Sequence, residues 1–205
     1  QSPHTAEFDY SLMVEDLHEF IQEHNLQEPI VIGHSMGGKT AMNFAVKYPN
    51  LLNRLIVVDI MPKSYPVHHD HILDGLHSID LATLTSRTDA DTQLSKHVTE
   101  PDVRQFLLKN LYRTSDGKFA WRVNLAAIDA HIEEIGAGML YVGTYTGPTL
   151  LIKGARSNYY ADGDEQTIKA IFQKAEIVTL NTGHWVQAEN PVEFSATVLD
   201  FLKRA

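Results

Sequence analysis

Apolar residues recur every three to four positions near the start of the chain, with acidic residues between them. The apolar positions are Met13, Leu17, Phe20 and Ile21. This spacing places them on one face of a helix and the charged side chains on the other faces. The pattern therefore predicts an amphipathic helix over residues 10–24.

A short apolar strand and a glycine-rich turn are predicted next. Residues 30–32 read IVI, residues 33–38 contain three glycines, and the helix that follows ends before Pro49, because proline cannot continue a helix. A second run, residues 55–60, is apolar apart from Asp59. Such a nearly continuous run is typical of a strand covered on both faces of a parallel sheet.

The middle of the chain, residues 62–146, has a different character. It is richer in polar side chains, and its clearest pattern is helical, at residues 103–111. No strong strand pattern occurs between Met61 and Tyr141. We therefore expect a helical insertion here.

The alternation of strand and helix resumes at Pro148. Strands are predicted at residues 149–152 and 176–180, with a helix near residues 164–173 between them. The last helix has a clear start, because Asn190 suits the N-cap position and is followed by proline and, two residues later, by glutamate.

Together these elements predict an α/β fold with a mostly parallel sheet and helices on both of its faces. We expect residues 1–61 and 147–205 to form the core and residues 62–146 to form an α-helical cap.

Composition and charge exclude several classes of protein. Of the 205 residues 43% are hydrophobic, which is ordinary for a globular chain. The 26 acidic residues outnumber the 17 basic ones, so a nucleic-acid partner, which needs a basic surface, is not expected. The absence of cysteine excludes a thiol nucleophile, and no apolar run is long enough to span a membrane.

The glycine-rich turn matches two catalytic patterns at once. From Gly33, the residues GHSMG fit the G-x-S-x-G of a nucleophile elbow centred on Ser35. The longer run to Thr40, GHSMGGKT, also fits the G-x-x-x-x-G-K-[ST] of a phosphate-binding loop, in which Lys39 would reach a phosphate. Both patterns need a strand, a tight turn and a helix, so the local pattern does not separate them.

A nucleophile elbow makes specific demands on its neighbours. Ser35 would adopt a strained backbone conformation, and we expect Gly33 and Gly37 to be needed because their positions would leave no room for a Cβ. The backbone N–H of Met36, at the start of the following helix, would donate a hydrogen bond to an oxyanion.

The order of the remaining polar residues favours the elbow. His184 follows the last predicted strand, and Asp59 ends an earlier one. The order serine, aspartate, histidine is the one found in hydrolases built on such an elbow. Lys39 and Asp59 are also only 20 positions apart, which leaves little room for the switch loops of a nucleotide hydrolase.

The identity of the catalytic acid is a separate question. Most hydrolases with this turn place it after the strand predicted at residues 149–152, where this chain has Ser157. A serine does not stabilise an imidazolium as a carboxylate does. Asp59 is therefore favoured, and Asp162 or Asp164 is the alternative.

Several segments resemble the YbfF-type esterases, which are α/β-hydrolase serine esterases with a helical cap. The segments are GHSMGGK from residue 33, VVDI from residue 57 followed by Pro62, FLLKNL from residue 106, DGKFAWRVNL from residue 116 and GHW from residue 183. The resemblance extends over essentially the whole chain. It implies Ser35 as nucleophile, His184 as general base and Asp59 as acid, with acyl esters or thioesters as substrates and no cofactor.

Three further residues are candidates for the substrate pocket. His34 and Trp185 adjoin the expected nucleophile and base, and Trp121 lies in a segment that carries the resemblance, although core packing suits it equally well.

A histidine-rich run suggests a metal site at first sight. It contains His68, His69, Asp70 and His71. No partner ligands recur at metal-binding spacing, so a polar loop is favoured and no metal is expected.

The sequence thus predicts a cytoplasmic serine carboxylesterase. The alternatives are a nucleotide hydrolase that uses residues 33–40 as a phosphate loop, and a non-catalytic binding module on a hydrolase scaffold. The chain begins without methionine, and about 50 residues of strands and helix that precede the elbow in this fold are not in the sequence. We therefore expect a partial chain that lacks its second oxyanion donor, with the missing N-terminal segment as a partner.

Overall fold

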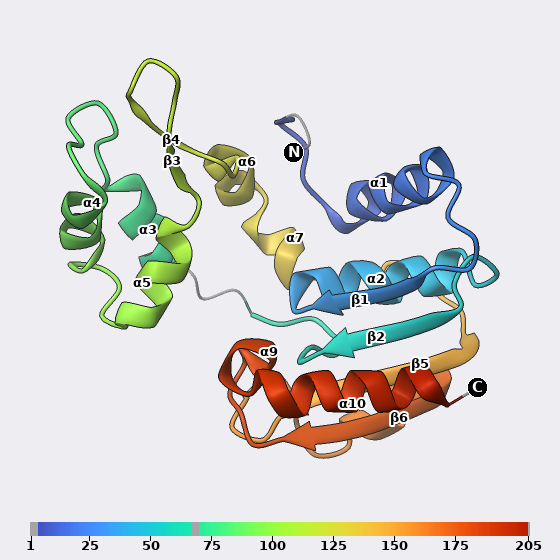
Figure 1. Ribbon diagram of the computed structural model, residues 1–205. Coiled ribbons are helices and arrows are strands. Elements are labelled where there is room, and N and C mark those ends of the chain that lie inside the picture. Colours follow the sequence, from blue (N-terminus) through green and yellow to red (C-terminus); the bar gives the residue numbers. More distant parts are fainter. Residues whose placement is uncertain (1–3, 67–69, 205) are drawn as a thin grey trace. The chain divides into compact units, whose positions relative to one another are not determined.

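The computed structural model describes residues 4–66 and 70–204, which fall into two compact units (Figure 1). The larger unit comprises residues 9–65 and 134–204, and the smaller unit comprises residues 4–8, 66 and 70–133. Each unit has its own apolar core.

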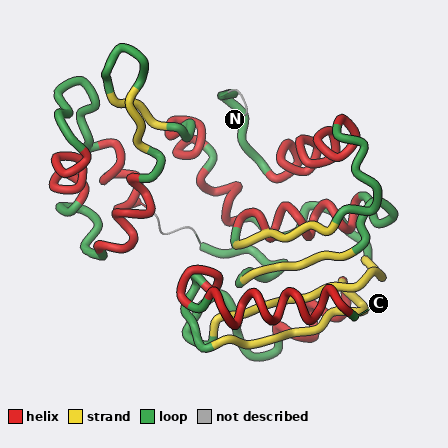
Figure 2. The backbone as a smooth tube through the Cα atoms, viewed as in Figure 1, coloured by secondary structure: helices red, strands yellow, loops and turns green. Residues whose placement is uncertain are grey.

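A four-stranded parallel sheet forms the centre of the larger unit (Figure 2). Its order is β1-β2-β5-β6, with bounds Ile30–His34, Arg54–Val58, Tyr145–Gly154 and Phe172–Leu180. The register pairs His34 with Val58 and Val58 with Ile152. The strands therefore present their carboxyl ends at one edge, where ligands bind in open α/β sheets.

Helices cover both faces of this sheet. One face carries α1 (Tyr10–Glu23), α2 (Met36–Lys47) and α8 (Asp164–Ile171), and the other carries α9 (Val186–Glu189) and α10 (Pro191–Lys203). In β2, Leu55 and Val57 pack into the first layer, while Ile56 and Val58 pack into the second. The continuous apolar run of β2 thus has the predicted cause, which is burial on both faces.

β1 is an edge strand of this sheet. Ile30 and Ile32 are 46% and 50% exposed, whereas Val31 packs on the core beneath α1 and α2. Apolar side chains therefore continue onto a part of the sheet that the helices of the described chain leave open.

The smaller unit is mostly helical. It contains α3 (Asp70–His77), α4 (Arg87–Leu94), α5 (Pro101–Leu108) and α6 (Leu125–Ala130), and α7 (Ile132–Gly136) leads back into the larger unit. It also contains an antiparallel hairpin of β3 (Leu111–Arg113) and β4 (Phe119–Trp121). The sequence predicts no strong strand between Met61 and Tyr141, and it does not reveal this hairpin, because three-residue strands are too short to show an alternating pattern.

Other predicted elements are confirmed with shifted bounds. β5 and β6 begin at Tyr145 and Phe172, four residues before the predicted strands, where polar residues hide the apolar pattern. The last helix starts as predicted, because the Asn190 side chain accepts a hydrogen bond from the Glu193 backbone N–H at 3.2 Å.

Candidate active site

Ser35 occupies the sharp turn between β1 and α2. Its backbone dihedrals are φ 52° and ψ −120°, which cost a non-glycine residue on the order of 1–3 kcal/mol. Two backbone hydrogen bonds support the turn, from the Ser35 N–H to the Val58 carbonyl at 3.0 Å and from the Lys39 N–H to the Ser35 carbonyl at 3.1 Å. The strained conformation predicted for Ser35 is therefore present.

The glycines around Ser35 have unequal roles. A Cβ on Gly33 would collide with the Gly37 carbonyl, as the sequence predicts. The same prediction is wrong for Gly37, where a Cβ would have no atom within 4 Å. A Cβ on the next residue, Gly38, would instead lie 2.6 Å from Cγ2 of Ile60. The close approach within the turn therefore requires Gly33, and the packing of α2 on the chain after β2 requires Gly38.

The structure brings Ser35, His184 and Asp59 together. His184 Nε2 lies 3.1 Å from Ser35 Oγ, and His184 Nδ1 lies 2.7 Å from Asp59 Oδ2. The Asp59 side chain is completely buried, while that of His184 is 21% exposed. These distances are within reach for a histidine that removes a serine proton while a carboxylate holds its other nitrogen.

Asp59 is held in place by its surroundings. Its backbone has a φ of 50°, and its N–H donates to the Ile152 carbonyl at 2.8 Å. Its carboxylate accepts hydrogen bonds from the Gly154 N–H at 2.8 Å, from the Ser157 hydroxyl and from His184. Three donors thus offset the cost of burying this charge.

The two alternative acids have different surroundings from those of Asp59. Asp164 accepts from Lys63 Nζ at 2.6 Å and from the Ala161 N–H at 2.8 Å, and Asp162 is exposed. Ser157, considered from the sequence only as the place of a missing acid, donates its hydroxyl to Asp59. The sequence does signal this contact, because a hydroxyl stands where hydrolases of this type carry a carboxylate.

Aromatic rings surround the imidazole of His184. The ring centroids of Tyr159, His34 and Trp185 lie 4.3, 4.6 and 5.6 Å away. His34 and Trp185 therefore lie beside His184, and their expected place in a substrate pocket stays a prediction. Tyr159 was missed, because a tyrosine in a loop has no pattern that marks it.

His34 also contacts the backbone of the same loop. Its Nε2 donates to the His184 carbonyl at 2.8 Å. The pKa of His34 is lowered, mainly by burial and further by the neighbouring His184, while the bond to the carbonyl and the charge of Asp59 oppose that shift.

Trp121 belongs to the smaller unit. It lies in β4, opposite Leu111 of β3, and packs partly buried against the apolar cluster of that unit. This is the packing role that the sequence allowed.

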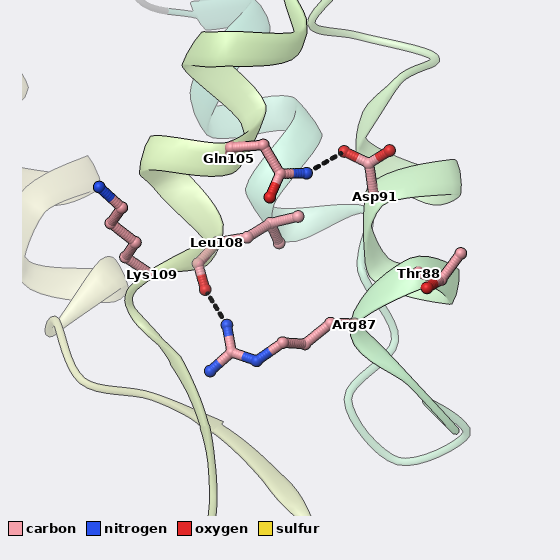
Figure 3. Close-up of a pocket in the computed structure, with 6 residues that line it drawn as sticks. All are labelled: Arg87, Thr88, Asp91, Gln105, Leu108 and Lys109. Atoms are coloured by element: carbon pink, nitrogen blue, oxygen red, sulfur yellow. Dashed lines mark hydrogen bonds between the residues drawn. The ribbon is translucent and has the colours of Figure 1, made fainter.

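The smaller unit also has a cleft of about 380 Å³ between α4 and α5 (Figure 3). Polar groups that line it bond to one another: Arg87 donates to the Leu108 carbonyl, and the Gln105 amide donates to the Asp91 carboxylate.

Of the histidine-rich run, His68 and His69 lie outside the described residues. Within residues 4–66 and 70–204, no cluster of three or more histidine or acidic side chains is arranged to hold a metal ion.

Lys39, the lysine of the phosphate-loop pattern, is buried and hydrogen-bonded to the backbone. Its side chain is 2% exposed, and Nζ donates to the carbonyls of Gly136, at 3.0 Å, and Ala137. Burial lowers its pKa from 10.5 to about 8. The phosphate-loop interpretation needs this lysine to bind a phosphate. Here its amine is instead hydrogen-bonded to backbone carbonyls at the end of α7, so the structure does not favour that interpretation.

Met36 is the first residue of α2. Its N–H belongs to the first turn, where helices have no internal acceptor for their backbone donors.

Among the described helices, none combines the length and apolar character that crossing a bilayer would require.

Comparison with known proteins places this site in context. A family model described as alpha/beta hydrolase fold matches residues 1–191. An sn-1-specific diacylglycerol lipase, ABHD11 of Danio rerio, is 37% identical over 99% of this chain and 66% of its own length. Esterase YbfF of Escherichia coli is 30% identical over 93% of this chain and 73% of its own. The solved structure of a marine microorganism esterase superposes with a TM-score of 0.94 at 40% identity, covering 98% of this chain and 80% of that one.

A serine on a strained strand–helix turn, beside a histidine and a carboxylate at the carboxyl edge of a parallel sheet, defines the class of hydrolases with a nucleophile elbow. This chain belongs to the α/β-hydrolase fold family. It spans about two thirds of the length of the first of its curated relatives.

Proposed function

We propose that the protein is a serine carboxylesterase that hydrolyses acyl esters, including thioesters, through an acyl-enzyme on Ser35. The observation that carries the proposal is the hydrogen-bonded chain from Ser35 Oγ through His184 to Asp59, with distances of 3.1 and 2.7 Å. Relatives that are named as an esterase and as a lipase support this choice of reaction.

The first half of the reaction forms the acyl-enzyme. His184 Nε2 takes the proton of the Ser35 hydroxyl while Oγ bonds to the acyl carbonyl carbon. The resulting imidazolium gives that proton to the leaving alcohol or thiol, whose bond to the acyl carbon breaks. Asp59 orients His184 and stabilises its charged form, and the Met36 N–H donates to the oxyanion.

The second half restores the enzyme. Water loses a proton to His184 as its oxygen attacks the acyl carbon, and the proton returns to Ser35 Oγ as the carboxylic acid leaves. Residues 62–146 are proposed to act as a cap. The apolar cluster of the smaller unit supports this role, because it shows that most of this segment, residues 66 and 70–133, packs on a core of its own.

The proposal is tested by labelling the protein with a fluorophosphonate and measuring hydrolysis of p-nitrophenyl butyrate. Wild type should gain one adduct by intact-protein mass spectrometry, and Ser35→Ala should lose both the adduct and the turnover. Ser95→Ala, which alters an exposed serine of the smaller unit, is the matched control and should behave as wild type. Retention of label and turnover by Ser35→Ala would overturn the proposal, and turnover by wild type excludes a binding module.

A further inference from the structure

We propose that His34 is a positioning residue that holds the main chain of His184 beside Ser35 through a single side-chain hydrogen bond to the His184 carbonyl. This inference rests on the function proposed above. It gives His34 a part in the reaction that differs from the pocket-lining role expected from the sequence.

The hydrogen bond from His34 to the His184 carbonyl joins the end of β1 to the loop after β6, two strands that do not pair with each other in the sheet. His34 ends β1, and His184 lies in the loop after β6. These strands are the two edges of the β1-β2-β5-β6 sheet, so two strands separate them. With neighbouring strands about 4.8 Å apart, the loop has to reach across roughly 14 Å of the carboxyl edge to bring His184 to Ser35. The 2.8 Å contact between His34 Nε2 and the His184 carbonyl lies where the loop has crossed to β1.

The other bonds of this loop are made close to β5, β6 and α9. The Arg156 N–H donates to the Thr182 carbonyl at 2.9 Å, and the Gly183 N–H donates to the Glu189 carboxylate at 2.8 Å. After His184, the N–H groups of Ala188 and Glu189 both donate to the Trp185 carbonyl at 2.8 Å. They hold the residues before and after His184 rather than the His184 carbonyl itself. On the side of Ser35, the bond from His34 holds the His184 backbone.

This bond is also independent of the chemistry. The side-chain bonds of His184 to Ser35 and Asp59 change as a proton moves onto and off the imidazole. The bond to the backbone carbonyl involves neither of those nitrogens. It therefore keeps its donor and acceptor through the whole cycle, including the state in which the Ser35 Oγ is acylated.

The charge state of His34 suits this role. Because the carbonyl only accepts, His34 carries its proton on Nε2. A second positive charge 4.6 Å from the His184 ring would oppose formation of the imidazolium. Burial, the main influence on its pKa, disfavours that charge, although the nearby Asp59 carboxylate favours it.

Three substitutions separate positioning from other roles. His34→Leu removes the donor, His34→Gln retains an amide N–H at a similar reach, and His34→Asn retains the amide but is shorter. We expect kcat for p-nitrophenyl butyrate to fall about 10- to 100-fold in the leucine and asparagine variants, with KM within about twofold of wild type. The glutamine variant should recover to within about fivefold of wild type. The rate of fluorophosphonate labelling of Ser35 should follow kcat.

The comparison of glutamine with asparagine keeps the test decisive even where the leucine variant does not fold. His77→Leu, which alters an exposed histidine paired with Asp129, is the control and should match wild type. Unchanged kcat in His34→Asn, a loss confined to KM, or equal losses in the asparagine and glutamine variants would overturn the inference. Activity in Ser35→Ala would instead contradict the proposed function, so the two failures are distinguishable.

Discussion

The buried carboxylate of Asp59 accepts hydrogen bonds from Gly154, Ser157 and His184, and only a carboxylate at this position offers two acceptor oxygens with a full negative charge. Asp59→Asn should therefore lower kcat for p-nitrophenyl butyrate by about 10³- to 10⁴-fold, because a neutral amide neither stabilises the imidazolium nor keeps its tautomer.

The matched control for this variant is Asp164→Asn, which neutralises one of the alternative acids, a carboxylate that pairs with Lys63. Its kcat should stay within about threefold of wild type. A larger loss in Asp164→Asn than in Asp59→Asn would show that the catalytic acid is Asp164, after β5, and not Asp59, after β2.

Lys39 provides a prediction about stability and pH. Folding lowers its pKa from 10.5 to about 8, so between these values the unfolded chain binds more protons than the folded one. The free energy of unfolding therefore rises with pH across this window, because the penalty for burying the charged amine disappears. Relative to Lys39→Met, wild type should gain up to about 3 kcal/mol between pH 8 and pH 10.5.

Urea unfolding at several pH values measures this difference. Lys118→Met, at a lysine whose side chain is 79% exposed, should show a constant difference from wild type over the same range. A constant difference for Lys39→Met as well would show that the buried amine is not the titrating group.

At the scale of elements, the first turn of α2 has to fit against Ile60, which is 3% exposed and β-branched. Gly38→Ala would place a Cβ 2.6 Å from its Cγ2, and we expect a loss of about 1–3 kcal/mol in the free energy of unfolding. Gly37→Ala is the matched comparison one residue earlier. It should leave stability unchanged or raise it by up to about 1 kcal/mol, because alanine favours a helix more than glycine does. Thermal unfolding of the two variants tests this, and equal effects would contradict the assigned packing.

The elements that could be predicted from the sequence are those with a long repeating pattern or a strong local signal. The helix at residues 10–23, the doubly buried β2 and the Asn190 cap are of this kind. The β3–β4 hairpin could not be predicted, because its strands have three residues each and their stability comes from packing on the cluster of the smaller unit.

At the scale of the whole molecule, Ser35 and His184 lie 149 residues apart and still meet. Their chain order and their places after strands pointed to that meeting, because the carboxyl ends of parallel strands share an edge. The contacts that refine the site were not predictable in the same way. Those of Tyr159 and of the His34 ring nitrogen depend on how loops cross the edge, which no local pattern encodes.

The open edge at β1 has a consequence for handling the protein. An edge strand with unpaired backbone groups and the exposed side chains of Ile30 and Ile32 is a template onto which another chain can add a strand. Concentrated solutions should therefore scatter light increasingly with time, and Ile32→Lys should suppress that growth at unchanged thermal stability. Leu199→Lys removes an equally exposed apolar side chain from α10, where the helix pairs its own backbone, and should leave the scattering as it was. We therefore expect aggregation during storage to depend on this one edge strand rather than on the total exposed apolar area, so that a single lysine on the strand lengthens the time for which the protein can be kept.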